Sequence, residues 1–258
     1  MKRLLLSLAM VLALAAPSFA AEDIVVGVTP FPHKDIMRAA KPLLAKDGYN
    51  LVIKEFTDYV QPNMALASKQ LFANFFQHEP YLDNMNKEKK LDLVSIGKVH
   101  IEPLGVYSKK IKKLADLKKG NSISVPNDPT NEARALRLLE ANGVITIKPG
   151  ALVTVADITK NPLGLKFHEL DAAQLPRTLD DVTASVINTN FAGEAGLVPA
   201  RDALVMEGSE SPYANIVVVR NEDKDSPKAK ALMKAVQSPE VKAYIQKNLV
   251  ERGIVPVF

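Results

Sequence analysis

A cluster of aromatic side chains in the first third of the chain is a candidate pocket wall. Six of the Phe and Tyr residues lie between Phe56 and Tyr81, and Phe56, Phe72 and Phe75 are expected to belong to hydrophobic core. The other side chains of this stretch stand in polar loop contexts (TDYVQPN and FFQHEPYLD), and the pocket candidates are Tyr59, Phe76, His78 and Tyr81. Aromatic and imidazole groups at strand-to-helix junctions suit the wall of a binding pocket.

A single arginine near a predicted helix start could hold one carboxylate. In the run PNDPTNEARALRLLEANGVI, Asp128 or Thr130 can cap the helix and Gly143 can end it. Arg134 lies in the first or second turn, and helical side chains lean back toward the N-terminus, where the free N–H groups are. Arginine beside a helix start suits a carboxylate, and Asn131 shares this position. A surface arginine fits the same pattern equally well.

Two asparagines lie where apolar strands meet polar sequence. Asn188 follows the apolar run before it, and Asn215 precedes the run IVVVR. An amide offers both a donor and an acceptor, as a zwitterionic ligand needs. Taken alone, such residues are more often turn formers.

No catalytic motif accompanies these residues. The chain has no Gly-rich phosphate loop, GxSxG or HExxH, and Asp180 and Asp181 point to different helix faces. The four histidines, none with metal-ligand spacing, are His33, His78, His100 and His168. Unless they converge in the fold, they predict no metal site. The sequence therefore favours a binding protein without cofactor or metal over an enzyme.

Composition and charge are those of an ordinary globular protein. The 258 residues are 47% hydrophobic and 24% charged, and the net charge of +4 is too small and scattered to indicate a nucleic-acid protein. The lysine-rich stretch 108–119 has no interleaved aromatics after Tyr107, which favours a solvated connection. The lack of cysteine excludes disulfides, thiolate metal sites and lipid attachment through an N-terminal cysteine.

The first twenty residues have the pattern of a signal peptide. Lys2 and Arg3 precede an apolar run from Leu4 to Ala15, which is too short for the ~20 residues that span a bilayer. Small residues at Ser18 and Ala20 form a cleavage site after Ala20. We therefore expect residues 1–20 to be removed and the mature product to be exported and soluble.

Strand-like and helical segments alternate along the mature chain. Strands are predicted at 24–28, 51–56, 71–76, 93–98, 122–125, 184–187 and 216–220, and helices at 36–44, 63–69, 84–90 and 131–142. Two closing helices begin at Ser226-Pro227 and Ser238-Pro239. Strand–helix–strand repetition predicts an α/β protein with mainly parallel sheets covered on both faces.

Long ordered motifs give the mature chain a resemblance to a known family. The motifs are FTDYVQPN, ANFFQHEPYLD, GVYSKKIKKLADLKKG, VPNDPTNEARALRLLEANGVI, LDAAQLPRTLDDV, VINTNFAGEAGL and SPYANIVVVR. Together they resemble the NlpA-type family, the methionine-binding components of ABC importers. The sequence departs from this family in VTPFPHKDI, which lacks a glycine between the prolines, and in KQLFANFF, which lacks acidic residues before ANFFQH.

The resemblance implies a two-lobed periplasmic-binding-protein fold, similar to type II, with two crossover strands. Lobe 1 would comprise residues 21–107 and 215–258, and lobe 2 residues 108–214. Hinges are expected near Gly105–Ser108 and Ala214–Val217.

The resemblance also implies the site. The ligand carboxylate would lie on Arg134, with polar contacts from Asn188 and Asn215. The side-chain pocket would match Tyr59, Phe76, His78 and Tyr81. Glu169 and Asp171 are the candidates for the group that accepts the ligand ammonium.

The implied function is capture of methionine, of either L or D form, or of a related amino acid or short peptide, for the permease of an ABC importer in the inner membrane. Without a lipobox cysteine, the protein would be a free periplasmic monomer with no nucleic-acid partner. An exported enzyme or an amino-acid-sensing receptor on the same fold stays open as an alternative.

Overall fold

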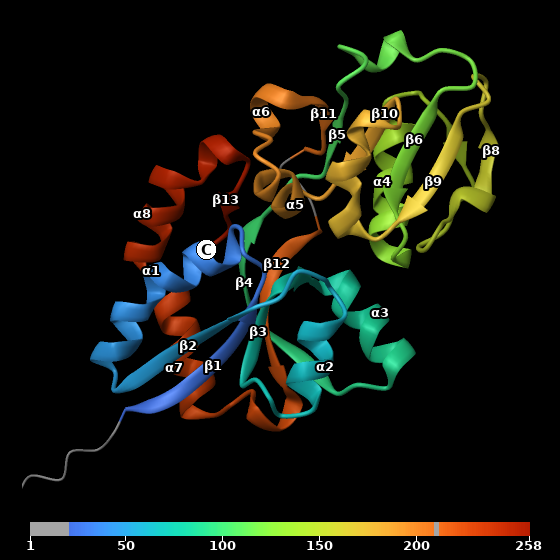
Figure 1. Cartoon of the computed structure of the whole chain (residues 1–258). Coiled ribbons are helices and arrows are strands. Elements are labelled where there is room, and N and C mark those ends of the chain that lie inside the picture. The colour runs from blue at the N-terminus through green and yellow to red at the C-terminus, as the bar shows by residue number, and fades with distance from the viewer. Residues whose placement is uncertain (1–20, 209–211) are drawn as a thin grey trace, which may run out of the picture.

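The protein, described here from a computed structural model, has two large sheets with separate hydrophobic cores (Figure 1). The structure describes residues 21–208 and 212–258. The predicted signal peptide, residues 1–20, lies outside the described residues. Among the described residues, none of the helices has the length and apolar character needed to cross a bilayer.

Lobe 1 contains both ends of the described chain. Its sheet has the order β13-β4-β12-β3-β1-β2. The strands are β1 (Glu22–Val28), β2 (Tyr49–Glu55), β3 (Ala73–His78), β4 (Leu93–Ile101), β12 (Ala214–Arg220) and β13 (Val255–Pro256). The helices are α1 (His33–Lys46), α2 (Gln61–Ala67), α3 (Glu79–Lys89), α7 (Pro227–Val236) and α8 (Pro239–Asn248), with short 3-10 turns at Asn221–Asp223 and Val250–Arg252.

Helices cover both faces of the lobe 1 sheet. Helices α1, α7 and α8 pack on one face, while α2 and α3 lie on the other (Figure 1). The central strand β12 serves both cores, because successive side chains of a strand point to opposite faces. Val217 and Val219 join the core under α1, whereas Ile216 and Val218 face Leu66 of α2 and Leu82 of α3.

Lobe 2 is formed by one continuous stretch of chain. Its main sheet has the order β11-β5-β10-β6-β9, and β7 and β8 form a separate pair. The strands are β5 (Gly105–Tyr107), β6 (Ser122–Pro126), β7 (Thr146–Ile147), β8 (Ile158–Lys160), β9 (Lys166–Leu170), β10 (Ala184–Ile187) and β11 (Ala203–Met206). The helices are α4 (Pro129–Ala141), α5 (Thr189–Glu194) and α6 (Pro199–Asp202), with 3-10 segments at Leu114–Asp116, Val155–Asp157 and Ala172–Asp180.

Two crossovers connect the lobes, and both differ from the predicted hinges. β5 pairs with β10 and β11, so Gly105–Tyr107 belong to the second sheet and not to lobe 1. The first crossover is therefore 102–104. The second leaves lobe 2 after β11 ends at Met206 and enters lobe 1 where β12 begins at Ala214, which is where the second hinge was predicted to start.

The prediction of mainly parallel sheets is wrong. β1 is parallel to β2 and β3, but β12 is antiparallel to both β3 and β4, and β13 is antiparallel to β4. In lobe 2, β6 is parallel to β9 and β10, while β5 is antiparallel to β10 and β11. β5 and β12 enter their sheets from the other lobe, without the helical crossover that a parallel neighbour requires, and both pair antiparallel to their neighbours.

Candidate ligand-binding site

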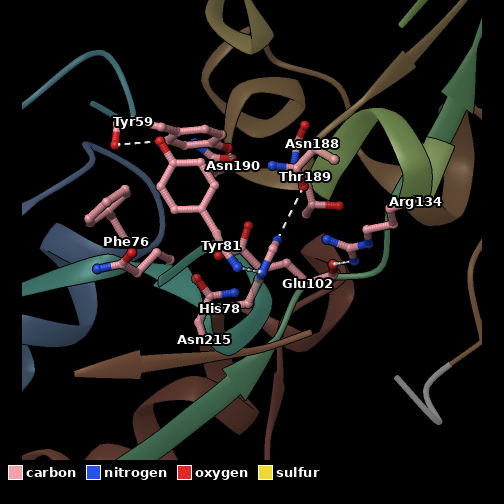
Figure 2. Close-up of a pocket in the computed structure, with 12 residues that line it drawn as sticks. Tyr59, Phe76, His78, Tyr81, Glu102, Arg134, Asn188, Thr189, Asn190 and Asn215 are labelled. Carbon is pink, nitrogen blue, oxygen red and sulfur yellow. Dashed lines mark hydrogen bonds between the residues drawn. The ribbon is translucent and has the colours of Figure 1, made fainter. Parts of the chain in front are cut away.

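A pocket between the lobes gathers all eight predicted ligand-binding residues (Figure 2). These residues are Tyr59, Phe76, His78, Tyr81, Asn131, Arg134, Asn188 and Asn215. Four further lining residues were not predicted, namely Gln77, Glu102, Thr189 and Asn190. Residues separated by more than a hundred positions thus meet in one cleft.

Aromatic rings close one end of the pocket. The Tyr59 ring centroid lies 5.9 Å from Phe76 and from Tyr81, and 5.0 Å from Phe191. The Tyr81 hydroxyl donates to the backbone carbonyl of Tyr59 over 2.9 Å (Figure 2). Burial raises the pKa of the Tyr59 and Tyr81 hydroxyls, so both stay neutral. This end of the pocket is apolar and suits an uncharged side chain.

His78 connects the aromatic end to lobe 2. The Tyr81 N–H donates to His78 Nδ1, so the ring proton is on Nε2, which lies 3.2 Å from Asn131 Oδ1. The same Asn131 oxygen accepts from Asn188 Nδ2 over 3.0 Å, and Asn131 Nδ2 donates to both carboxylate oxygens of Asp128. Burial, followed by the charge of Arg134, lowers the pKa of His78 to about 3, so the ring is neutral.

Two buried amide atoms of lobe 2 have no partner among the described residues. They are Asn188 Oδ1, an acceptor, and Asn190 Nδ2, a donor. The other end of the Asn190 amide is fixed, because the Tyr59 hydroxyl crosses the cleft and donates to its Oδ1 over 2.6 Å. A buried unpaired polar atom costs about 1–3 kcal/mol, which a ligand with matching groups would offset.

Arg134 is buried, which excludes the alternative of a surface arginine. Its side chain is 4% exposed. Nε donates to Glu207 Oε1 over 2.7 Å, and Nη2 bonds to the second oxygen of Glu207 and to the Glu102 carbonyl. The guanidinium therefore reaches Glu102 and Glu207 on the two crossovers between the lobes. Nη1 makes no hydrogen bond to any described residue.

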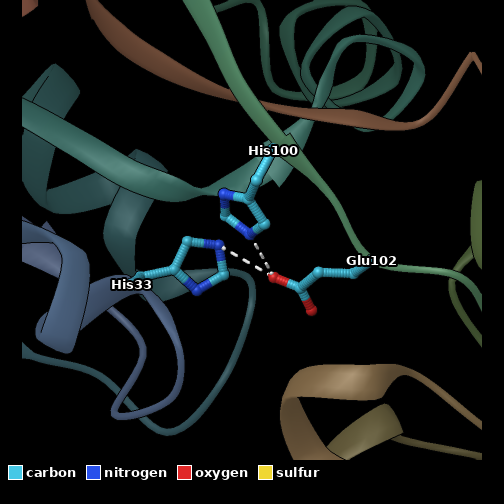
Figure 3. Close-up of side chains that lie close together, drawn as sticks. All are labelled: His33, His100 and Glu102. Atoms are coloured by element: carbon cyan, nitrogen blue, oxygen red, sulfur yellow. Dashed lines mark hydrogen bonds and ion pairs between the residues drawn. The ribbon is translucent and has the colours of Figure 1, made fainter. Parts of the chain in front are cut away.

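Behind Asn215 lies a buried cluster of two histidines and a carboxyl group (Figure 3). His100 Nε2 is 2.7 Å and His33 Nε2 is 3.3 Å from Glu102 Oε1. His33 Nε2 also donates to Asn215 Oδ1 over 2.9 Å, while Thr29 Oγ1 lies 2.6 Å from its Nδ1. The Asn215 oxygen is thereby engaged, and its amide nitrogen is the group left for a ligand.

Burial determines the charge of this cluster. It lowers the pKa of His33 to about 4 and that of His100 to about 3, and it raises the pKa of Glu102. Both rings are therefore neutral at pH 7. Three of the cluster's donor atoms lie within 4.8 Å of one another and could hold a metal ion, but each already bonds to a protein group in this arrangement. The histidines that looked scattered in the sequence, His33 and His100, do converge in the fold.

The wall beside the aromatic end rests on a buried amide network. Asn63 Nδ2 donates to Gln77 Oε1, and Asn63 Oδ1 accepts from Asn74 and Gln77 over 2.8 and 2.7 Å. Gln77 Nε2 also donates to Asn74 Oδ1. Because every amide group has a partner, this network fixes α2 to β3 and holds the rest of the wall in place.

The two predicted ammonium acceptors do not line the pocket. Glu169 lies in β9, and Asp171 accepts from Asn127 Nδ2 at the outer mouth of the cleft. The acceptors inside the pocket are Asn188 Oδ1 and Glu102. Glu102 was missed because it follows β4 in an apolar context, with no motif that marks it.

Comparison with known proteins gives consistent matches over nearly the whole mature chain. The family model described as NlpA lipoprotein matches residues 24–258. The chain is 45% identical to the D-methionine-binding lipoprotein MetQ of Escherichia coli strain K12 over 234 residues, covering 88% of this chain and 85% of that protein. It is 46% identical to outer membrane lipoprotein 3 of Mannheimia haemolytica, with 89% of each chain covered.

Solved structures agree with the sequence matches. A nutrient-binding protein from Burkholderia cenocepacia bound to methionine is 50% identical and superposes with a TM-score of 0.88, covering 91% of this chain and all of that one. A structure of the methionine-binding protein MetQ is 42% identical with a TM-score of 0.87, covering 92% of this chain and 98% of that one. The fold of this chain is therefore that of substrate-binding proteins of ABC transporters.

Proposed function

The chain belongs to the NlpA lipoprotein family, and we propose that it captures methionine and delivers it to the permease of an ABC importer. The observation that carries the proposal is the pocket itself. It joins an aromatic end to a polar end in which one acceptor, Asn188 Oδ1, and one donor, Asn190 Nδ2, have no partner among the described residues. These are the groups that the side chain and the zwitterionic head of an amino acid need.

At the polar end, separate groups bind the two opposite charges of the ligand. Arg134 Nη1 and the Asn215 amide nitrogen are donors for the carboxylate. Asn188 Oδ1 is the buried acceptor for the ammonium, and Glu102 lines the same cleft. This assignment supports a free α-amino acid as the ligand.

The aromatic end selects the side chain by shape and polarity. Phe76 and Tyr81 are 4% and 5% exposed, and Tyr59 closes the space between them and lobe 2. Their rings offer polarizable apolar surface, with which a thioether sulfur makes favourable contacts of about 0.3–1.5 kcal/mol. Methionine fits this chemistry better than a charged or short side chain does.

Hydrogen bonds across the cleft couple binding to closure of the lobes. Tyr59 and His78 of lobe 1 bond to Asn190 and Asn131 of lobe 2. A ligand that pairs the remaining amide atoms adds to the same interface and stabilises the closed form, which a permease would recognise. The protein would act outside the cytoplasmic membrane as a soluble monomer, without catalysing a reaction.

The test is calorimetry on protein freed of ligand by unfolding and refolding. Methionine is expected to bind with micromolar or tighter affinity, roughly −8 kcal/mol or better. L- and D-methionine are measured separately, and the recovered ligand is analysed for chemical change. Absence of heat with both enantiomers would contradict the proposal, and a product in the recovered ligand would favour an exported enzyme.

A further inference from the structure

Arg134 already has a carboxylate partner, which belongs to the protein. Glu207 follows β11 at the start of the second crossover and accepts hydrogen bonds from Arg134 Nε and Nη2. The two side chains are 4% and 16% exposed, so the pair is largely removed from water. A ligand carboxylate on Arg134 would therefore be the second carboxylate at one guanidinium.

This pair uses the planar fork of the guanidinium. Nε and one N–H of Nη2 bond to Glu207, and Nη2 also donates to the Glu102 carbonyl over 2.8 Å. The Tyr213 ring lies against the guanidinium, with its centroid 4.3 Å from Cζ. Only Nη1 is left to face a ligand, so the two-pronged grip that arginine offers a carboxylate is not available in the cleft.

The position of Glu207 does not depend on a ligand. Its Oε2 accepts from the Leu104 N–H over 3.0 Å, and its own N–H donates to the Leu104 carbonyl over 2.9 Å. Leu104 lies on the first crossover and Glu207 on the second. The two crossovers are thus joined at the residue that holds Arg134.

The charge of Glu207 also changes how well the cleft can distinguish a charged from a neutral ligand head group. It neutralises Arg134, and the neighbouring ring of His78 is neutral because burial keeps its pKa at about 3. A neutral acyl group, such as a carboxamide, then loses one charge-assisted hydrogen bond at Nη1 but leaves no buried unpaired cation behind. The penalty for such a ligand is correspondingly small.

We propose that Glu207 is a positioning residue that sets how strictly the cleft requires a free carboxylate: by holding and neutralising Arg134, it makes the cleft tolerant of amino acids with a neutral acyl head. The inference rests on the proposed function, because it concerns the head group of the same amino-acid ligand.

The experiment compares methionine with methioninamide, in which a neutral carboxamide replaces the carboxylate. Calorimetry at pH 6 keeps both amines protonated, because an α-amino group titrates near ~7.7–8.0. The wild type should prefer methionine by less than about a hundredfold, the range for one hydrogen bond to a charged group. In Glu207→Gln, Arg134 has no charged partner, and the preference for methionine over methioninamide should rise at least about tenfold.

Asp202→Asn is the matched control. Asp202, five residues before Glu207, forms an ion pair with the adjacent Arg201 at the surface and does not line the pocket. In this variant, the ratio of the affinities for methionine and methioninamide should stay within about threefold of the wild-type ratio, as expected for a surface pair. Glu207→Asp keeps the charge and should also retain a ratio close to that of the wild type.

Three results would overturn the inference. One is a folded Glu207→Gln variant in which both ligands weaken equally, because loss of structure alone lowers both affinities without changing their ratio. The second is rejection of methioninamide by the wild type by more than about a thousandfold, which would decide the question even if the Gln variant did not fold. The third is a preference for methionine over methioninamide that rises in Glu207→Asp as it does in Glu207→Gln. Failure of the wild type to bind methionine would instead contradict the proposed function.

Discussion

The aromatic and polar ends of the pocket are assembled in opposite ways. Phe76, His78 and Tyr81 come from one β3–α3 junction, so residues close together in the sequence form most of the wall. The polar end brings Arg134 of α4 to Glu102 and Glu207, one on each crossover. The aromatic end is therefore a local structure, whereas the polar end exists only when the lobes and both crossovers are in place.

Because of this difference, the two ends of the pocket should tolerate substitutions to different degrees. The aromatic rings gain most of their free energy from burial, which is roughly proportional to area and does not depend on direction. The polar end depends on directed bonds between buried charges, where removing one partner leaves the other unpaired. We expect substitutions at the polar end to have the larger effects on binding.

Arg134→Ala tests the polar end and should have the largest effect. It removes the donor proposed for the ligand carboxylate and leaves Glu207 without its cation. The ligand carboxylate loses its charge-assisted hydrogen bond and meets the uncompensated charge of Glu207, which should cost about 2–5 kcal/mol and lower affinity for methionine between about thirtyfold and several thousandfold. Calorimetry measures the affinity, and thermal melts confirm folding.

The control is Arg137→Ala, one helical turn away. Arg137 bonds to the carbonyls of Gly150 and Ala151 and lies outside the pocket. Its affinity for methionine should match the wild type. Equal binding by the Arg134 and Arg137 variants would show that Arg134 does not hold the carboxylate and that the two ends do not differ in this way.

Phe76→Ala tests the aromatic end. The ring is 4% exposed, and its loss opens the pocket where the ligand side chain is expected. Affinity for methionine should fall by about 1.5–3 kcal/mol, the range for burying a large apolar side chain. Affinity for alanine, which does not reach this wall, should change little. An equal loss for both amino acids would indicate damage to the fold in place of a lost side-chain contact.

Ser226→Ala tests whether stability can change without affecting either end. Ser226 Oγ accepts from the Ala229 N–H at the start of α7, on the far side of lobe 1. Loss of this cap should lower the free energy of unfolding by about 0.5–2 kcal/mol, measured by urea denaturation. Methionine affinity of the folded variant should be unchanged, and a large change would mean that α7 is coupled to the cleft.

The smallest expected effect is the absence of histidine titration in the folded protein. Burial lowers the pKa of His33 to about 4 and those of His78 and His100 to about 3. Ring ¹⁵N resonances should show these three side chains neutral from pH 7.5 down to pH 5. In urea the same rings should take up protons near the ordinary value of ~6.5.

The sign of the resulting pH dependence follows from proton counting. Between pH 6.5 and about 4, the unfolded chain binds more protons at these rings than the folded one. Their contribution to the free energy of unfolding therefore falls as the pH is lowered through this range. Burial raises the pKa values of Glu132 and Glu194 to about 7. Above the ordinary pKa of a glutamate, the contribution of these two groups to the free energy of unfolding therefore falls as the pH rises, which is the opposite direction. A folded-state ring that titrates near 6.5 would contradict the burial of the site.

The sequence predicted the aromatic end better than the polar end for a physical reason. The motif FFQHEPYLD contains the strand end, the proline and the wall residues together, so local spacing was sufficient. Arg134 could also be identified, because a helix cap and a single arginine stand close together. Its partner Glu207 is about seventy residues away in a polar loop, and only the crossover geometry brings the two together.

The strands were predicted well where their apolar runs were continuous and poorly where they were short. β10 was found with its observed bounds, Ala184–Ile187. β11 and β9 were missed, because Ala203–Met206 is short and Lys166–Leu170 is mostly polar. The antiparallel pairing of β12 was also missed, since strand direction within a sheet is not encoded in local periodicity.

The place of β12 in the lobe 1 sheet has a consequence for the order in which the protein can fold. β12 lies between β3 and β4 and contributes side chains to the cores on both faces of the lobe 1 sheet. It begins only at Ala214. A chain that crosses a membrane from its N-terminus cannot complete this lobe until nearly all of it has emerged. Lobe 2, from Gly105 to Met206, has its whole sheet in one stretch and can form first. We therefore expect lobe 1 to close slowly and last, since the pairing of distant segments limits folding rates.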